Sequence, residues 1–196
     1  MTDHSIPLPD GTTYRTVPVH QGIKVIRTWA EHPWPMTTTQ AIALANQLGW
    51  VPCPDTPDVF TTNHNIEPQD ASFTSTDNVT VSTFNLTLAT FAPEELDSIT
   101  EPATRAAFEA YVQAFTKIYG SGKRKTNKGV TSTTWHLPSG ASIYLATIGS
   151  VLSSTIDSPQ SNEDAAGEER YFDEIMSEEE EEREVPVRPS HYRPKQ

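Results

Sequence analysis

The chain has few side chains suited to nucleophilic catalysis, and their spacing matches no common catalytic motif. The single cysteine, Cys53, lies between two prolines, and no helix N-terminus follows it. A Gly-x-Ser-x-Gly turn is also absent. His64 and His136 lie in expected strand regions, where an isolated histidine is more typical of a hydrogen-bonding surface residue. The spacing leaves open whether they meet Cys53 in space. We predict that the protein is not an enzyme.

Metal and phosphate sites are not indicated either. There is no cysteine pair, no His-x-x-x-His and no carboxylate spacing typical of a calcium loop. Residues 120–123, Gly-Ser-Gly-Lys, lack the spacing of a phosphate-binding loop and follow an expected helix instead of preceding one. We predict no metal and no cofactor.

Residues 121–129 form a basic run that includes Lys123, Arg124 and Lys125. We expect a flexible loop here. The run could bind an acidic partner or the protein's own acidic tail, or it could be a solvated connection between a helix and a strand.

Trp29 and Trp34 lie in an aromatic and proline-rich connector. They are candidates for a binding surface. The alternative is that they close over the end of a small core, which is the more common use of large aromatic side chains beside prolines.

Four apolar residues in the acidic C-terminal segment form a compact group at helical spacing. They are Tyr171, Phe172, Ile175 and Met176. Such a group, within a short helix over 168–182, could fold on binding and place its apolar side chains in a groove of a partner. The alternative is a solubilising tail in which these residues are incidental.

A long helix over 100–119 is the element around which the rest of the chain can pack. Apolar residues recur on one face at spacings of three and four. The helix is expected to begin with Thr100 as its cap and Pro102 in its first turn, and to end at Gly120. The apolar residues of this face are Phe108, Tyr111, Val112, Phe115, Ile118 and Tyr119.

A second helix is predicted over 37–49, where Thr37 and Gln40 match a capping box and Met36 precedes them. Upstream, residues 13–29 are rich in β-branched side chains and alternate in polarity. This pattern predicts a hairpin with a turn at Gln21 and Gly22, and Pro18 would then lie on an edge strand.

Alternating segments predict strands over 59–66, 71–76, 79–91, 130–137, 141–148 and 150–156. The apolar phase changes within 79–91, so either a bulge lies near Ser82 and Thr83 or the strand is buried on both faces. We predict an α+β fold with an antiparallel sheet of about five to seven strands packed by the two helices.

Charge and composition divide the chain into three parts. Residues 1–12 are expected to be flexible, 13–157 to form one domain, and 158–196 to be a disordered acidic tail. Residues 1–156 hold 13 acidic and 9 basic side chains, whereas 157–184 hold 13 acidic and 2 basic. An acidic chain without a leader peptide or a membrane-spanning stretch predicts a cytoplasmic protein that does not bind nucleic acid.

Several segments of the middle of the chain resemble an uncharacterised actinobacterial family of small α+β proteins, a domain of unknown function. They are the helix ending at Gly120, the basic loop, the segment Thr-Trp-His-Leu-Pro-Ser-Gly at 134–140, the strand at 143–145 and the strand ending at Ser158. The resemblance covers roughly residues 36–159. It implies a role like that of small immunity proteins or dedicated secretion chaperones.

Two functions remain as hypotheses. The first is a non-catalytic immunity protein that neutralises a secreted toxin or effector, where acidic groups would suit a basic partner. The second is a chaperone or adaptor of a secretion or assembly machine that docks through the acidic tail. Both imply a protein partner, and the sequence leaves the oligomeric state open.

Overall fold

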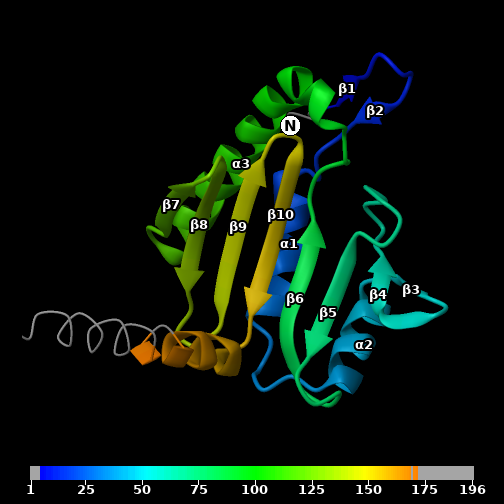
Figure 1. The fold of residues 1–196 in the computed structure, drawn as a ribbon. Coiled ribbons are helices and arrows are strands. Elements are labelled where there is room, and N and C mark those ends of the chain that lie inside the picture. Colours follow the sequence, from blue (N-terminus) through cyan, green and yellow to red (C-terminus); the bar gives the residue numbers. More distant parts are fainter. Residues whose placement is uncertain (1–4, 169, 172–196) are drawn as a thin grey trace, which may run out of the picture. The chain divides into compact units, whose positions relative to one another are not determined.

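The computed structural model describes residues 5–168 and 170–171, and their fold is α+β (Figure 1). The chain divides into two units, residues 1–162 and 163–196. In the first unit, helices pack against one large antiparallel sheet, which confirms the predicted fold class. The sheet has eight strands instead of five to seven, and α1 packs on it in addition to the two predicted helices.

The elements follow one another along the chain in this order: β1 (Ile6–Pro7), β2 (Thr13–Tyr14), α1 (Val19–Ala30), α2 (Thr38–Gln47), β3 (Val51–Cys53), β4 (Thr56–Thr61), β5 (Ala71–Ser75), β6 (Val81–Thr87), the 3₁₀ turn η1 (Glu94–Leu96), α3 (Asp97–Tyr119), β7 (Lys123–Asn127), β8 (Val130–His136), β9 (Ser142–Ile148) and β10 (Val151–Asp157).

The main sheet consists of two four-stranded meanders that meet at their last strands. The order across the sheet is β3-β4-β5-β6-β10-β9-β8-β7, so β6 and β10 form the central junction. α1 and α3 pack against each other and against β9 and β10, and α2 packs against β4. Figure 1 shows α1 behind the sheet, with the opposite face of β8, β9 and β10 turned toward the viewer.

Of the two alternatives left open for the third strand, the structure has the bulge. The register between β5 and β6 shifts so that Ser82 has no partner residue on β5. Because of this extra residue, Val81 and Phe84 are both buried despite their odd spacing. Val79, expected on the same face, lies in the preceding turn and is 57% exposed.

The hairpin predicted for 13–29 is wrong, because most of this segment forms α1. Pro18 is the N-cap residue of the helix and does not lie on an edge strand. The β-branched residues suggested a strand, but the buried positions recur with the period of a helix, and tertiary packing of that stripe outweighs the local strand preference. The buried residues of α1 are Gly22, Val25, Ile26, Trp29 and Ala30.

α2 begins as predicted. The Thr37 Oγ1 accepts a hydrogen bond from the Gln40 main-chain N–H at 3.2 Å, and the Gln40 Oε1 accepts one from the Thr37 N–H at 2.8 Å. Met36 is fully buried before this cap. Ala41 and Ala45 are the buried residues of the helix, and their small side chains allow α2 to lie close to the sheet.

α3 contains the predicted long helix but begins earlier, at Asp97, because η1 runs directly into it. Thr100 therefore lies inside the helix, where its hydroxyl donates to the Leu96 carbonyl at 3.2 Å, and Pro102 is also internal. The predicted end is confirmed, since Gly120 follows the helix with a φ of 81°. The predicted apolar face is buried at Phe108, Tyr111 and Phe115.

Two segments predicted to be flexible or disordered contain secondary structure. In the segment 1–12, β1 pairs with the following β2, and the Asp10 carboxylate accepts the Thr12 N–H at 2.9 Å in the intervening turn. After β10, residues 159–168 and 170–171 are helical, in part of the segment predicted to be disordered. Ser158 supplies the physical reason, because its hydroxyl caps this helix by accepting the Ser161 N–H at 3.1 Å. The remainder of the predicted tail lies outside the described residues.

Aromatic side chains form the core between the sheet and the helices. Trp29 of α1 stacks on Phe84 of β6 with ring centroids 4.0 Å apart, and Trp50 stacks beside both. Farther along the sheet, Phe115 of α3 packs against Trp135 of β8. One continuous cluster of buried residues therefore extends under both meanders. Among the described residues, no helix is both long enough and apolar enough to span a membrane.

Candidate protein-binding surface

The two tryptophans proposed for partner binding lie at the core. Trp29 is fully buried in the aromatic stack, so its assignment to a surface is wrong and the alternative of core closure holds. Trp34 is half-buried against the same cluster, and its Nε1 donates to the Ala30 carbonyl at 3.4 Å. Neither indole is presented as an exposed anchor.

The basic run is a strand and not a flexible loop. Lys123, Arg124 and Lys125 belong to β7, the edge strand beside β8. The Arg124 guanidinium donates to both carboxylate oxygens of Glu109 in α3, at 3.0 and 2.5 Å, and lies over the Phe108 ring. These hydrogen bonds lower the pKa of Glu109. Arg124 therefore clamps β7 to α3, whereas the two lysines point to the opposite face of the sheet.

The apolar group predicted in the acidic segment is described only at its first member. Tyr171 is 62% exposed at the end of the described helix. Phe172, Ile175 and Met176 lie outside the described residues.

The sheet order separates Cys53 from His136, two of the residues considered for catalysis. Cys53 is on β3 and His136 is on β8, six strand positions apart, which corresponds to about 29 Å at about 4.8 Å per strand. His64 lies in the loop after β4, where burial lowers its pKa and the nearby Asp70 carboxylate opposes the shift. Within the described ranges, no group of three or more histidine, cysteine, aspartate and glutamate residues is arranged to hold a metal ion.

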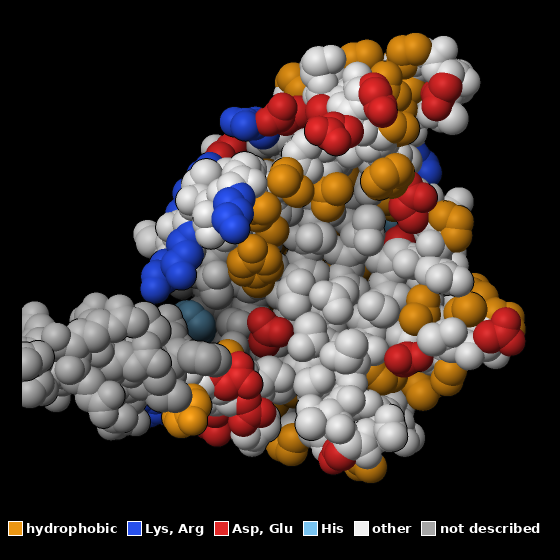
Figure 2. Space-filling model, viewed as in Figure 1, with side chains coloured by type: hydrophobic (Ala, Val, Ile, Leu, Met, Phe, Trp, Pro, Cys, Tyr) orange, Lys and Arg blue, Asp and Glu red, His pale blue; other side chains and the backbone are white. Residues whose placement is uncertain are grey.

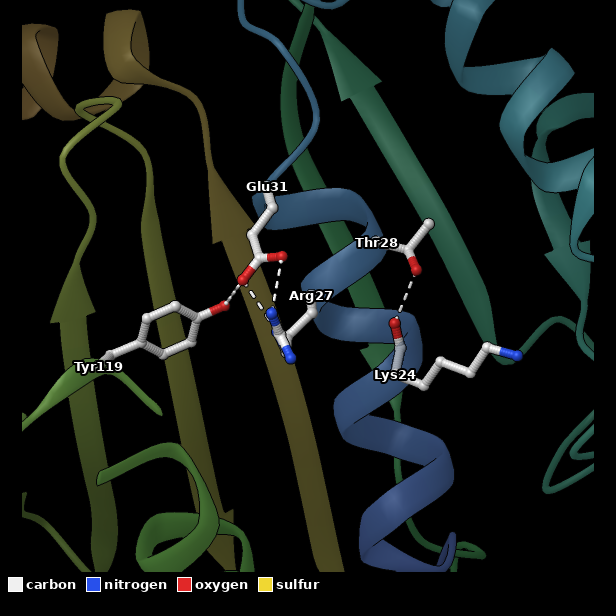
Figure 3. A network of polar contacts seen from close by, with 5 residues as sticks. All are labelled: Lys24, Arg27, Thr28, Glu31 and Tyr119. Carbon is white, nitrogen blue, oxygen red and sulfur yellow. Dashed lines mark hydrogen bonds and ion pairs between the residues drawn. The ribbon is translucent and has the colours of Figure 1, made fainter. Parts of the chain in front are cut away.

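A polar network joins α1 to the end of α3 (Figure 3). The Arg27 Nε donates to Glu31 at 2.8 Å, and the Tyr119 hydroxyl donates to the same carboxylate at 2.7 Å. The hydrogen bond from Arg27 is the main cause of the lowered pKa of Glu31. The groove beside this network has a volume of about 410 Å³. The charges of Arg27 and Glu31 neutralise each other, and the Tyr119 hydroxyl connects this pair to α3. We therefore interpret the network as a structural link between the two helices.

Three large apolar side chains are exposed at one end of the main sheet, and we call them the hairpin patch: Phe91, Ile148 and Val151. Their side chains are 68%, 46% and 41% exposed, respectively. Ile148 and Val151 are directly paired across the β9–β10 turn, so their side chains project from the same face of the sheet. Figure 2 shows hydrophobic side chains gathered over this end of the β9–β10 hairpin.

The sequence analysis missed the hairpin patch because it predicted strands over 141–148 and 150–156 without considering which face of the sheet Ile148 and Val151 occupy. The alternation of side chains along β9 did indicate that Ile148 lies on the other face. Ile143 and Leu145 share the buried face, and Ile148 is three positions after Leu145, which places it on the other face.

The main chain beneath the hairpin patch is held by hydrogen bonds from several elements. The Ser150 N–H donates to the Asp97 carboxylate at 3.1 Å, its hydroxyl donates to the Ala92 carbonyl at 3.0 Å, and its carbonyl accepts the Tyr14 hydroxyl at 2.7 Å. The Phe91 N–H donates to the Glu67 carboxylate at 2.6 Å. The exposed side chains therefore stand on a fixed frame formed by β2, the segment of Phe91 and Ala92, the first residue of α3 and the β9–β10 turn.

Acidic side chains lie on one side of the hairpin patch. Glu94 and Glu95 are exposed in η1, three and four residues after Phe91. Glu67 and Asp97 lie closer, in the hydrogen bonds that hold the frame. Basic residues lie nearby as well: Arg15 bonds through its main-chain N–H to Thr90, and the β7–β8 turn of Lys128 and Gly129 lies beside Ile148. The surface is thus an apolar centre with acidic side chains on the side of Phe91 and a basic turn beside Ile148.

A comparison with protein-family models matches residues 20–158 to DUF6301, described as a family of unknown function. The chain belongs to the DUF6301 family. The match includes α1 to β10 and therefore the whole of the main sheet. A search of the curated proteins and a search of the solved structures found no match.

Proposed function

We propose that this DUF6301 protein is a non-catalytic cytoplasmic binding protein, most concretely an immunity protein that neutralises a secreted toxin or effector. The observation that carries the proposal is the hairpin patch on its fixed frame. An exposed phenylalanine with two aliphatic neighbours is an energetically costly surface unless a partner covers it.

The geometry of the patch supports a protein partner. Interfaces commonly have an apolar centre and a polar rim, and a few central aromatic side chains contribute most of the binding energy. Because the main chain of Phe91 and Ser150 is already fixed by hydrogen bonds, little conformational entropy remains to be lost when a partner binds.

The acidic side chains near Phe91 support a partner with a basic region that faces them. Glu94 and Glu95 extend into solvent beside the apolar centre, so a partner with lysine or arginine around an apolar pocket would be complementary. Such complementarity accelerates association, which suits a protein that must neutralise a toxic effector before it acts.

Co-expression tests the proposal. Where a neighbouring gene encodes a toxic effector, cells that express this effector should grow when the wild-type protein is present. Phe91→Asp should abolish this rescue, because truncating a central aromatic anchor typically costs about 2 kcal/mol or more of binding free energy. Val79→Asp is the matched control, since Val79 is also exposed but lies in the β5–β6 turn at the other end of the sheet.

Toxicity that the wild-type protein does not relieve would contradict the immunity function. Rescue that Phe91→Asp leaves intact would instead contradict the assignment of the hairpin patch as the interface.

The second candidate is a chaperone or adaptor of a secretion or assembly machine that docks through the acidic segment. The described helix favours it, because residues 170–171 are still helical and Tyr171 is exposed at the start of the predicted apolar group. Tyr171→Asp in the full chain should then abolish retention of the machine's components, whereas Phe91→Asp should not. Retention that is lost with Phe91→Asp and kept with Tyr171→Asp would favour the immunity function.

A further inference from the structure

We propose that the free edge of β7 binds an acidic, extended segment of a partner protein, which adds to the main sheet as an antiparallel strand. This interaction is separate from the hairpin patch and does not depend on the immunity function. Four observations support it: the free backbone groups of the edge, the placement of its lysines, the contrast with the other sheet edge, and the unfavourable pairing of two copies.

The backbone of β7 presents hydrogen-bonding groups to its open side. Lys128 and Gly129 form a two-residue turn with φ angles of 48° and 84°, as in a type I′ turn, and the turn joins Asn127 directly to Val130. In such a hairpin the closing pair is hydrogen-bonded, and hydrogen-bonded and non-bonded pairs then alternate along the ladder. Arg124 and Thr126 therefore direct their N–H and C=O groups away from β8, toward the open edge.

The side chains of β7 divide between the two faces. Arg124 points toward α3, where Glu109 and Phe108 already occupy it. Lys123 and Lys125 point to the opposite face and are exposed, and within the described residues neither forms an ion pair. Two unpaired ammonium groups thus lie beside the free backbone groups.

The opposite edge of the sheet is less suited to accept a strand. β3 has only three residues, its central residue is Pro52, and its register with β4 is irregular between Pro52 and Cys53. A proline and an irregular register are features that block strand addition. β7, with five residues in regular register, has neither.

A second copy of this chain is a poor occupant of the edge. Two β7 strands paired across a two-fold axis would place lysines of both copies on the same face and close together, which is unfavourable. A segment with glutamate or aspartate at alternate positions would instead place carboxylates beside Lys123 and Lys125. The charge of the edge therefore selects an acidic strand.

A labelled synthetic peptide that alternates Glu and Thr tests the proposal with the full-length protein at low salt. Lys123→Glu combined with Lys125→Glu should weaken peptide binding by about tenfold or more. Lys24→Glu combined with Lys117→Glu is the matched control, because both lysines are exposed on helices and the net charge changes equally. An equal loss of peptide affinity in the two double variants would overturn the proposal.

Two N-methylated peptides distinguish strand addition from simple charge attraction. In an antiparallel pairing with glutamates on the lysine face, the Thr residues of the peptide direct their N–H groups toward Arg124 and Thr126. N-methylation of the Thr residues should therefore weaken binding by about tenfold or more, whereas N-methylation of the Glu residues should not. Equal affinities of the two peptides would overturn the proposal.

The alternative occupants have their own outcomes. If Glu178→Gln through Glu182→Gln, made together in the full chain, strengthened peptide binding to the wild-type edge but not to the Lys123→Glu and Lys125→Glu variant, the edge would belong to the chain's own acidic segment and the proposal would be wrong. If sedimentation showed a dimer that dissociates in the Lys123→Glu and Lys125→Glu variant, a second copy would be the occupant, and the proposal would again be wrong.

Discussion

At the scale of single residues, Asp70 organises the loop that connects β4 to β5. Its buried carboxylate accepts the Thr62 N–H at 2.6 Å, the Thr62 hydroxyl at 2.8 Å and the Ile66 N–H at 3.2 Å. The loop in turn holds His64 with its Nε2 buried, and no described residue bonds to that atom. A neutral imidazole is tolerated there, whereas a charged one would lose its hydration.

This environment predicts a pH-dependent contribution of His64 to stability. Burial lowers the pKa of His64 from its ordinary value of 6.5 in the folded state, so below about pH 6.5 the unfolded chain binds the proton more readily than the folded chain. The stabilising contribution of neutral His64 is complete above about pH 6.5 and is lost as the pH falls through the lower pKa that His64 has in the folded state. Chemical unfolding of the wild type and His64→Gln between about pH 5 and 8 should show curves that diverge only on the acidic side. Parallel curves would contradict the buried imidazole.

At the scale of elements, one glycine sets the distance between α1 and α3. The Tyr111 hydroxyl of α3 donates to the Val17 carbonyl at 3.0 Å, just before α1 begins. A Cβ atom at Gly22 would overlap that hydroxyl and the ring atoms next to it. The close contact of the two helices therefore requires the absence of a side chain at this position.

Gly22→Ala should destabilise the protein even though alanine is the better helix former. Relief of the overlap requires a shift of buried Tyr111, and overpacking of this kind costs about 1–3 kcal/mol. The control is Gly167→Ala, which lies in a helical segment where a Cβ atom would meet nothing within 4 Å. Thermal unfolding should show a lower midpoint for Gly22→Ala alone. An unchanged or raised midpoint would show that the two helices can separate at little cost.

At the scale of the whole molecule, the junction between β6 and β10 makes one sheet of two meanders. Phe84 lies on this junction, paired with Ile156 on β10 and stacked on Trp29 of α1. The buried cluster continues from there to Trp135 under the second meander. We therefore expect the two meanders to unfold together and not as separate bodies.

Phe84→Ala tests this cooperativity. Removing the buried ring should cost about 3–5 kcal/mol of the free energy of unfolding. Native-state hydrogen exchange should show a similar loss of protection in peptides from β5 and from β8, which belong to different meanders. Loss confined to β5 would show that the meanders open independently.

Much of the secondary structure was predictable because its signals are local. The capping box at Thr37 and the end of α3 at Gly120 each depend on a few neighbouring residues, and both are confirmed. The phase change of the third strand indicated either a bulge or a strand buried on both faces, and the register decided for the bulge. The segment of α1 was misassigned, since its β-branched residues favour a strand locally and only the burial of its stripe against the sheet makes the helix stable.

By itself, the sequence determined the fold class, most of the strands and the long helix, because hydrophobic period and capping chemistry act over short distances. The tertiary structure alone decided where the candidate binding residues lie. Trp29 is in the core, Lys123 and Lys125 lie on an edge strand, and Phe91 is brought to the β9–β10 turn by hydrogen bonds between distant segments. Strand order and contacts across long stretches of chain set these positions, and no local pattern encodes them.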